Sequence, residues 1–184
     1  VEPILKECGV PDDLKYLMVI ESNLSPTARS AAGAAGLWQF MQATGRQYGL
    51  EVNVNIDERY NIEKATRAAC AYLKESYEMY GDWMTVAASY NGGQNGISRR
   101  LEQQRVDKAL DLWLVEETSR YMFRILTAKL VLENPKAYGF VLKRSQLYPY
   151  IPPKEIITTT QQIDDLTAFA KKHGVTVAQL KEEN

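Results

Sequence analysis

The sequence predicts a mainly α-helical protein with a short C-terminal appendage in which helix and strand are mixed. Two observations carry this prediction. Across residues 1–140 apolar side chains recur at helical spacing, and glycine or proline separates one apolar run from the next. After Gly139 the composition changes to a proline-containing stretch and a β-branched run. We therefore expect a helical domain over residues 1–143 and a linker with a short appendage over residues 144–184.

The first functionally important helix is expected to start at Pro11, which two acids follow. Proline in the first turn and acids near the positive end of the helix dipole are typical of a helix start. Leu14, Leu17 and Met18 follow at helical spacing. Glu21 continues this stripe at the C-terminal end of the helix, so its carboxyl group should face inward among apolar side chains.

Caps and glycines mark the other expected elements. We expect helices at residues 37–48 before Gly49, 61–80 before Gly81, 83–90 after Asp82, about 96–103, and one or two within 107–133. In the appendage we expect an extended segment at 148–153, a strand at 155–160, and helices at 164–172 and from 176. Trp83 and Trp113 fit helix-packing patterns better than ligand-binding platforms, and we expect both to lie between helices.

Composition limits the possible functions. The net charge of −1 over 184 residues disfavours broad nucleic-acid binding, and no apolar run approaches the roughly 20 residues that cross a bilayer. Any export signal or membrane anchor would lie upstream of Val1. The single histidine, His173, is expected to lie in the last turn of a helix. We therefore expect no metal site, no bound cofactor and no Ser-His-Asp triad. Cys8 and Cys70 could form one disulfide or remain two small buried thiols.

Glu21 is the candidate catalytic residue. It follows the apolar run Leu17–Ile20 and precedes a glycine- and alanine-rich stretch at residues 30–36. Burial disfavours the charged form of a carboxyl group and keeps it protonated to higher pH. A protonated carboxylic acid beside a small-residue cleft is the minimum equipment for cleaving a glycosidic bond.

A second carboxylate, which an ordinary glycosidase needs, is hard to find near Glu21. Residues 22–50 contain no Asp or Glu. Asp57 and Glu58 come later, and we expect them to cap a turn and to pair locally with Arg59. The sequence therefore indicates a mechanism with one acid.

Three ordered blocks carry a resemblance to a known family. Glu21 with residues 30–41 (SAAGAAGLWQFM), residues 88–93 (ASYNGG) and residues 117–121 (ETSRY) resemble the lytic transglycosylases with a goose-lysozyme-like fold. The resemblance covers roughly residues 1–140. It is closest to the membrane-bound lytic murein transglycosylase D branch, which shares the WQFM form of residues 38–41. It implies a lysozyme-like, goose-type helical catalytic domain.

The activity that the resemblance implies is cleavage of the bond between N-acetylmuramic acid and N-acetylglucosamine in peptidoglycan. Glu21 would first protonate the glycosidic oxygen and then take the proton of the muramic acid C6 hydroxyl, which leaves a 1,6-anhydro end. The implied partner is the peptidoglycan glycan strand, bound by a monomer. The implied location is the periplasm or cell envelope of a bacterium, with a lipoprotein anchor upstream of this chain.

The resemblance also implies substrate-binding positions, and several have plainer explanations. Ser30 could bond local backbone, Met41 could fill the core, and Asn91 could end a helix. Glu117 could be a solvated acid. The implied positions are Ser30, Gln39, Met41, Tyr72, Tyr90, Asn91, Glu117 and Tyr121.

Two alternative functions stay open at this point. A muramidase on the same fold would admit water in place of the C6 hydroxyl. A peptidoglycan-binding protein without catalysis is disfavoured because binding alone does not need a buried acid. Residues 150–184 loosely resemble the start of a LysM-like region, and we do not expect a complete peptidoglycan-binding module there.

Overall fold

The structure, a computed structural model, describes residues 1–147 and 156–182 and divides into two compact units, Val1–Gly139 and Phe140–Asn184. The extended segment expected at residues 148–153 lies outside the described residues. The boundary between residues 143 and 144 stays a prediction.

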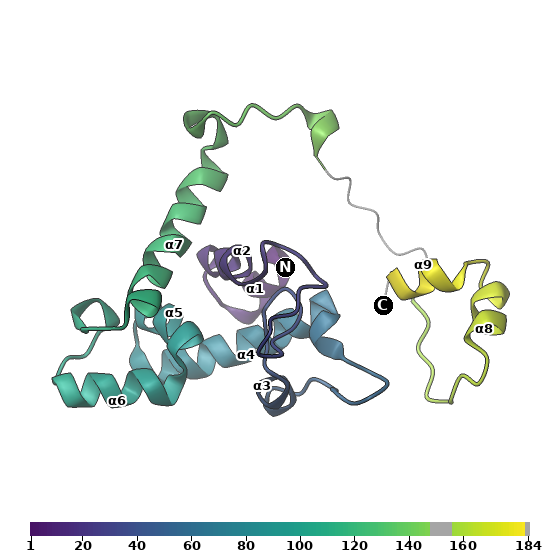
Figure 1. Cartoon of the computed structure of the whole chain (residues 1–184), viewed down its shortest axis with the longest axis horizontal. Coiled ribbons are helices and arrows are strands. Elements are labelled where there is room, and N and C mark those ends of the chain that lie inside the picture. Colours follow the sequence, from purple (N-terminus) through teal and green to yellow (C-terminus); the bar gives the residue numbers. More distant parts are fainter. Residues whose placement is uncertain (148–155, 183–184) are drawn as a thin grey trace. The chain divides into compact units, whose positions relative to one another are not determined.

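The first unit is a bundle of helices joined by turns and by longer loops, and the mainly α class is confirmed (Figure 1). Its α-helices are α1 (Glu2–Cys8), α2 (Tyr16–Ser22), α3 (Gln42–Gln47), α4 (Ile62–Tyr80), α5 (Trp83–Gly92), α6 (Gln94–Gln104) and α7 (Glu116–Glu133). Short 3₁₀ helices lie at Asp12–Lys15, Glu58–Tyr60, Ala109–Asp111 and Pro135–Tyr138.

Side-chain caps and left-handed glycines set the helix ends where the sequence predicts them. The Asn61 side chain accepts a hydrogen bond from the backbone N–H of Lys64 at the start of α4, and Gly81 ends that helix with φ 62°. Asp82 caps α5 by accepting from the backbone N–H of Thr85. The long central helix and its successor therefore form as local signals predict.

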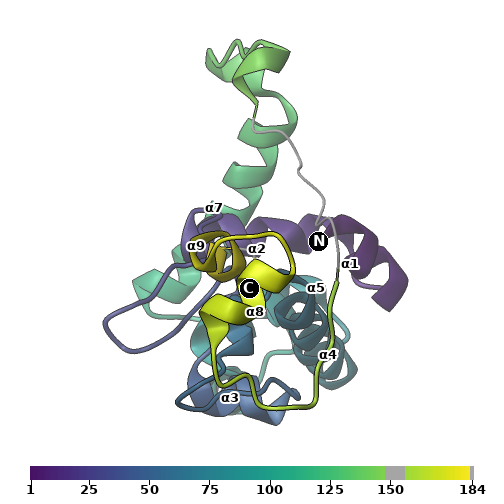
Figure 2. The same cartoon turned by 90° about the vertical axis from the view of Figure 1, so that its right-hand side faces the viewer.

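The core lies where α5 meets its neighbours. Figures 1 and 2 show α4 and α5 side by side, and α5 also packs against α6 and α7. The middle of α5 carries small residues, and Val86 and Ala88 are fully buried. Trp38 is also fully buried, and its indole N–H donates to the Thr66 hydroxyl at 3.0 Å. Since α2 packs against α7, the end of α2 is held against the core.

Cys8 and Cys70 are both free thiols, so the alternative without a disulfide holds, although only Cys70 is buried and Cys8 is half-buried. Cys70 is buried in α4, against which α1 packs. Burial and the neighbouring Cys8 raise the pKa of the Cys70 thiol to about 12.

The helix expected at residues 37–48 is wrong in its first part. Only Gln42–Gln47 is helical, and residues 28–40 form a folded loop in which Ala35 makes isolated antiparallel bridges with Arg29 and Phe40. Gly36 has φ 77° and Gln39 has φ 48°, which an α-helix does not allow. This loop lies beside α3 and is described further below.

The second unit contains α8 (Leu166–Lys172) and α9 (Val177–Glu182), both as expected. His173 follows α8 directly and Gly174 has φ 70°, as predicted for a helix end. The strand predicted at residues 155–160 is wrong for residues 156–160, which form no regular structure. A strand needs a partner for its backbone hydrogen bonds, and no β-strand occurs in the described residues of this unit.

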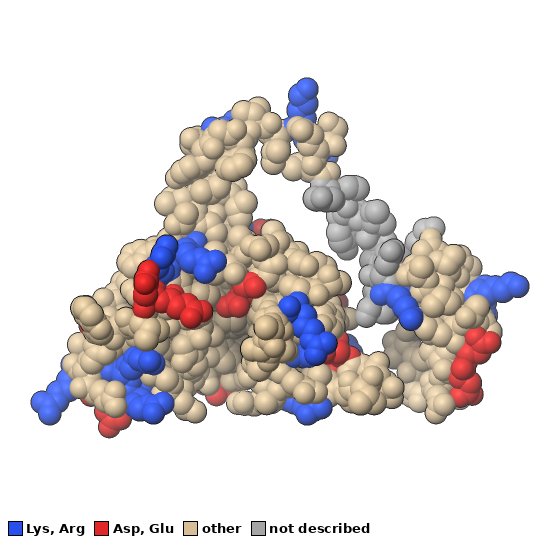
Figure 3. Space-filling model, viewed as in Figure 1, with Lys and Arg blue, Asp and Glu red and all other residues tan. Residues whose placement is uncertain are grey.

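Two surface findings complete the description. Within the described ranges, 1–147 and 156–182, the structure contains no helix that combines the length and apolar character needed to cross a membrane. Positive and negative side chains are interspersed on the face shown in Figure 3, as the near-zero net charge suggests.

Candidate active site

Glu21 lies one residue before the end of α2 and is half-buried. Its carboxylate accepts a hydrogen bond of 2.5 Å from the hydroxyl of Tyr121 on α7. Burial raises the pKa of Glu21, and the Tyr121 hydrogen bond and the charge of Arg124 oppose part of this shift. The negative charge of Glu117 raises the pKa further. The net direction is upward, as the apolar run before Glu21 predicts.

One face of α7 supplies all three of these neighbours. Glu117, Tyr121 and Arg124 are four and three residues apart, so they lie along one stripe of the helix. Tyr121 is 2% exposed, whereas Glu117 and Arg124 are exposed. The pKa of Tyr121 is raised well above its usual value by burial and by the charge of Glu21, so this hydroxyl remains a hydrogen-bond donor.

Tyr90 lies beside the acid but does not bond it. Its hydroxyl donates to the backbone carbonyl of Trp38 at 2.8 Å. Burial and then the charge of Glu21 raise the pKa of Tyr90. The hydroxyl that contacts the Glu21 carboxylate is that of Tyr121 and not that of Tyr90.

Tyr72 is buried in α4, and its ring packs edge-on against Tyr90 with centroids 5.2 Å apart. Its hydroxyl donates to the backbone carbonyl of Ser89 at 2.9 Å. Tyr72 therefore supports Tyr90 from the core.

Asn91 joins α5 to α7. Its side-chain oxygen accepts a hydrogen bond of 2.9 Å from the Thr118 hydroxyl, next to Glu117. Asn91 does not end its helix, because α5 continues through Gly92 and the chain turns at Gly93 with φ 73°. The bond holds the start of α7 at the end of α5.

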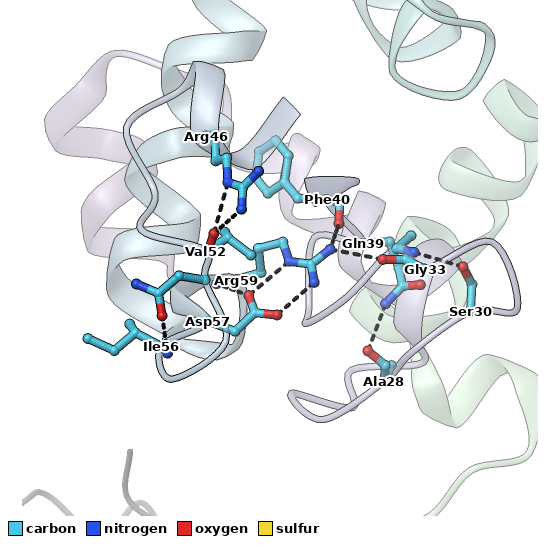
Figure 4. Close-up of polar contacts among 12 residues, drawn as sticks. Ala28, Ser30, Gly33, Gln39, Phe40, Arg46, Val52, Ile56, Asp57 and Arg59 are labelled. Carbon is cyan, nitrogen blue, oxygen red and sulfur yellow. Dashed lines mark hydrogen bonds and ion pairs between the residues drawn. The ribbon is translucent and has the colours of Figure 1, made fainter. Parts of the chain in front are cut away.

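The loop at residues 28–40 carries Ser30 and Gln39 (Figure 4). The Ser30 hydroxyl accepts a hydrogen bond of 3.0 Å from the backbone N–H of Ala34, which is the local role considered for it. The Gln39 amide donates to the carbonyls of Ala28 and Gly36 at 3.2 and 2.8 Å. Both side chains thus stabilise the loop through hydrogen bonds to its own backbone.

Met41 follows the loop and is 45% exposed, so its side chain is not core filling. This exposure leaves the thioether free to contact a bound ligand.

Arg59 is the important residue that the sequence did not reveal. The expected pairing with Asp57 forms, through bonds of 2.8 and 2.6 Å to the two carboxylate oxygens. In addition, the buried guanidinium donates to the carbonyls of Gly33 and Phe40, each at 2.9 Å (Figure 4). Arg59 therefore clamps both sides of the loop. An arginine in a polar turn gives no sequence signal for contacts with residues 19 and 26 positions away.

Two open hollows of about 480 and 500 Å³ lie elsewhere on the first unit, and Glu21 lines neither. Among the described residues no group of three or more His, Cys, Asp or Glu side chains could hold a metal ion. The site is defined by its hydrogen bonds and burial.

Comparisons with known proteins agree with this geometry. Residues 4–112 match the family described as transglycosylase SLT domain. The chain is 34% identical over 140 residues to membrane-bound lytic murein transglycosylase D of Escherichia coli, which covers 73% of this chain and 31% of that protein. The chain thus spans about a third of that relative's length.

Two solved structures share the fold. One is an inactive mutant of lytic transglycosylase Slt from Pseudomonas aeruginosa, with a TM-score of 0.58 and 24% identity over 74% of this chain and 24% of that one. The other is the 70 kDa soluble lytic transglycosylase of Escherichia coli, with a TM-score of 0.56 and 20% identity over 68% of this chain and 23% of that one. At these identities they establish the fold, which is the predicted lysozyme-like helical class. Because the family match covers more than half of the chain, this protein belongs to the family of transglycosylase SLT domains.

Proposed function

We propose that the domain is a peptidoglycan lytic transglycosylase that cleaves the β-1,4 bond between N-acetylmuramic acid and N-acetylglucosamine. The observation that carries the proposal is the half-buried carboxyl group of Glu21, whose pKa burial raises and which the Tyr121 hydroxyl holds in place. A carboxyl group with a raised pKa keeps a proton available for a leaving group near neutral pH. The name of the Escherichia coli relative, a lytic murein transglycosylase, agrees with this chemistry.

The proposed reaction uses Glu21 twice. Protonated Glu21 gives its proton to the glycosidic oxygen as the bond from C1 to that oxygen breaks, and N-acetylglucosamine leaves with a free 4-hydroxyl. The carboxylate then takes the proton of the muramic acid C6 hydroxyl, whose oxygen bonds to C1 and closes the 1,6-anhydro ring. One residue can serve both steps because the second step returns the proton that the first one used.

Tyr121 suits this double role. Its hydroxyl donates to the carboxylate, so it favours the charged form and limits the upward shift of the Glu21 pKa. By favouring the charged form, the bond supports the state in which Glu21 is ready to take the proton in the second step.

The other residues are proposed to bind the glycan strand. Ser30, Met41 and Glu117 are the exposed candidates, whereas Tyr90 and Asn91 are half-buried. Ser30 and Gln39 are proposed to present the loop at residues 28–40, and Tyr72 to support Tyr90. We further propose that the protein acts as a monomer in the bacterial cell envelope, where its membrane-bound relative is found.

A muramidase is the second candidate, and Glu117 is the observation that favours it. It is an exposed carboxylate on the same stripe of α7 as Tyr121, and its charge raises the pKa of Glu21, so in a muramidase it is the candidate for the general base that activates a water molecule. The two reactions differ in their products, because an anhydro end lacks one water relative to a reducing end.

Mass spectrometry of muropeptides from digested peptidoglycan tests the proposal. We expect anhydro ends, and release of reducing ends alone would establish the muramidase instead. Glu21→Gln should fold normally and lose almost all turnover, since the amide keeps the shape but cannot donate the proton. Glu63→Gln, at an exposed acid on α4, is the matched control and should retain full activity. Substantial activity in Glu21→Gln would show that another group is the acid.

A further inference from the structure

Trp113 is the exposed tryptophan of the first unit. Trp38 is fully buried, and Trp83 stacks on Tyr77 with ring centroids 4.1 Å apart. Trp113 is 88% exposed, so the expectation that it packs between helices is wrong.

The chain path explains the outward position of Trp113. Leu112 has extended backbone (φ −84°, ψ 139°), residues 113–115 form no regular structure before α7, and half-buried and exposed side chains alternate from Leu112 to Val115. Leu112 and Leu114 pack against the cluster that includes Ile97 and Met122, and Trp113 between them faces solvent. Local periodicity in the sequence did not reveal this extended step.

The backbone that carries the exposed indole is held in place by hydrogen bonds. The Gln104 side chain accepts a hydrogen bond of 2.8 Å from the backbone N–H of Trp113 and donates one of 3.0 Å to its carbonyl. These two bonds pin the segment to the end of α6. An aromatic side chain with only two rotatable bonds on a pinned backbone loses little entropy when it binds a ligand.

Two paths limit the distance between Trp113 and the residues around the catalytic acid. Along α6, Gln104 lies about 15 Å from Gln94, which follows the Asn91 block of the site. Along α7 and the segment before it, Trp113 lies at most about 18 Å from Tyr121. A glycan strand that is bound at Glu21 and extends several sugars beyond it is therefore long enough to reach the indole.

We propose that Trp113 is a stacking platform for a pyranose ring of the glycan strand, at a subsite several sugars from the bond that is cut. This inference rests on the proposed function and adds to it a preference for long glycan strands over short ones. The C–H bonds on one face of a pyranose form an apolar surface that matches the flat, electron-rich face of an indole. An exposed indole fixed in place at the surface of a polysaccharide-cleaving domain fits that ligand class.

Activity on strands of different length tests the platform. Glycan strands released from peptidoglycan and separated by length are the substrates. Trp113→Ala should lower kcat/KM on long strands about three- to tenfold, the range expected for one aromatic packing contact. On the shortest strands that are still cleaved, it should have little effect, since these cannot reach Trp113.

Phe123→Ala is the matched control. Phe123 is an aromatic residue of α7 that is 56% exposed, and it lies two residues from Tyr121, so it faces away from Glu21. This variant should cleave long and short strands like the unmodified protein. Because Trp113 is so exposed, Trp113→Ala should also leave the melting temperature unchanged.

Binding gives a second, independent readout. When long strands are added to the Glu21→Gln protein, its tryptophan emission should shift to shorter wavelength. In a double variant that also carries Trp113→Phe, most of that shift should be absent. If Trp113→Ala lost activity equally on long and short strands, or lost none on either, the platform would be refuted. The proposed function would still stand as long as the unmodified protein forms anhydro ends. Failure of the unmodified protein to form anhydro ends would refute the proposed function itself.

Discussion

Removing the Arg59 side chain should destabilise the loop that carries Ser30 and Gln39. In Arg59→Met the Asp57 carboxylate and the carbonyls of Gly33 and Phe40 lose four hydrogen bonds of 2.6 to 2.9 Å. The Arg59 side chain is 6% exposed and that of Asp57 is 26% exposed, so water can replace only part of what is lost. Methionine keeps the unbranched stem of the side chain and removes the charged guanidinium.

The magnitude follows from these contacts. Breaking a largely buried ion pair by removing one partner lowers the free energy of unfolding by about 3–5 kcal/mol. We take the cost of the two unpaired carbonyls to fall within this range. For a unit of this size, we expect the melting temperature to fall by about 10–20 °C. Cleavage of peptidoglycan should fall as well, even at temperatures where the variant stays folded, because both sides of the loop lose their common anchor.

Thermal unfolding followed by circular dichroism measures this effect. Arg59→Lys is the matched control, since it keeps the charge but cannot present a planar fork to four acceptors. Its melting temperature should lie between those of Arg59→Met and the original protein. Adding Asp57→Asn to Arg59→Met should cost little more, because the unpaired carboxylate is then gone. A melting temperature for Arg59→Met within about 2 °C of the original would refute the clamp.

The pH dependence of the same variant gives a further check. Arg59 lowers the pKa of Asp57, so the pair contributes stability above the unfolded pKa of about 3.8, and that contribution is lost as pH falls through the folded pKa. The difference in stability between Arg59→Met and the original protein should therefore shrink in acid.

Three other outcomes are expected. Gly36→Ala should unfold the loop or the domain, because Gly36 has φ 77° and an added Cβ would lie 1.9 Å from the carbonyl oxygen of Arg59; unchanged melting would contradict this close approach. Tyr121→Phe removes the hydrogen bond that lowers the pKa of Glu21, so the alkaline limb of kcat/KM should move to higher pH, and a shift to lower pH would argue against Glu21 as the acid. The pKa of Glu21 is higher in the folded protein than its ordinary value of 4.5. The contribution of Glu21 to the stability of the fold is therefore fully present below about pH 4.5 and is lost as the pH rises through the folded pKa. Glu21→Gln should thus gain stability relative to the original protein between pH 4 and neutral pH, which urea unfolding at both pH values would measure.

The sequence by itself determined the helices and the candidate acid. Caps and glycines such as Asn61, Gly81 and Asp82 act on residues within one turn, so they can be read from neighbouring positions. The apolar run before Glu21 likewise indicates a buried carboxyl group at the end of a helix.

Tertiary structure decided what surrounds that acid. Tyr121 donates to Glu21 across 100 residues, and Arg59 reaches Gly33 across 26, so only the path of the chain brings these groups together. The helix predicted over residues 37–41 does not form for the same reason, because the Phe40 carbonyl is bonded by Arg59 and the Trp38 carbonyl by Tyr90, both distant in sequence, and not by a helical ladder. Trp113 faces solvent because its neighbours Leu112 and Leu114 fill the space beside α5 and α6. Short-range signals set the helices, whereas burial and hydrogen bonding between distant segments set the site.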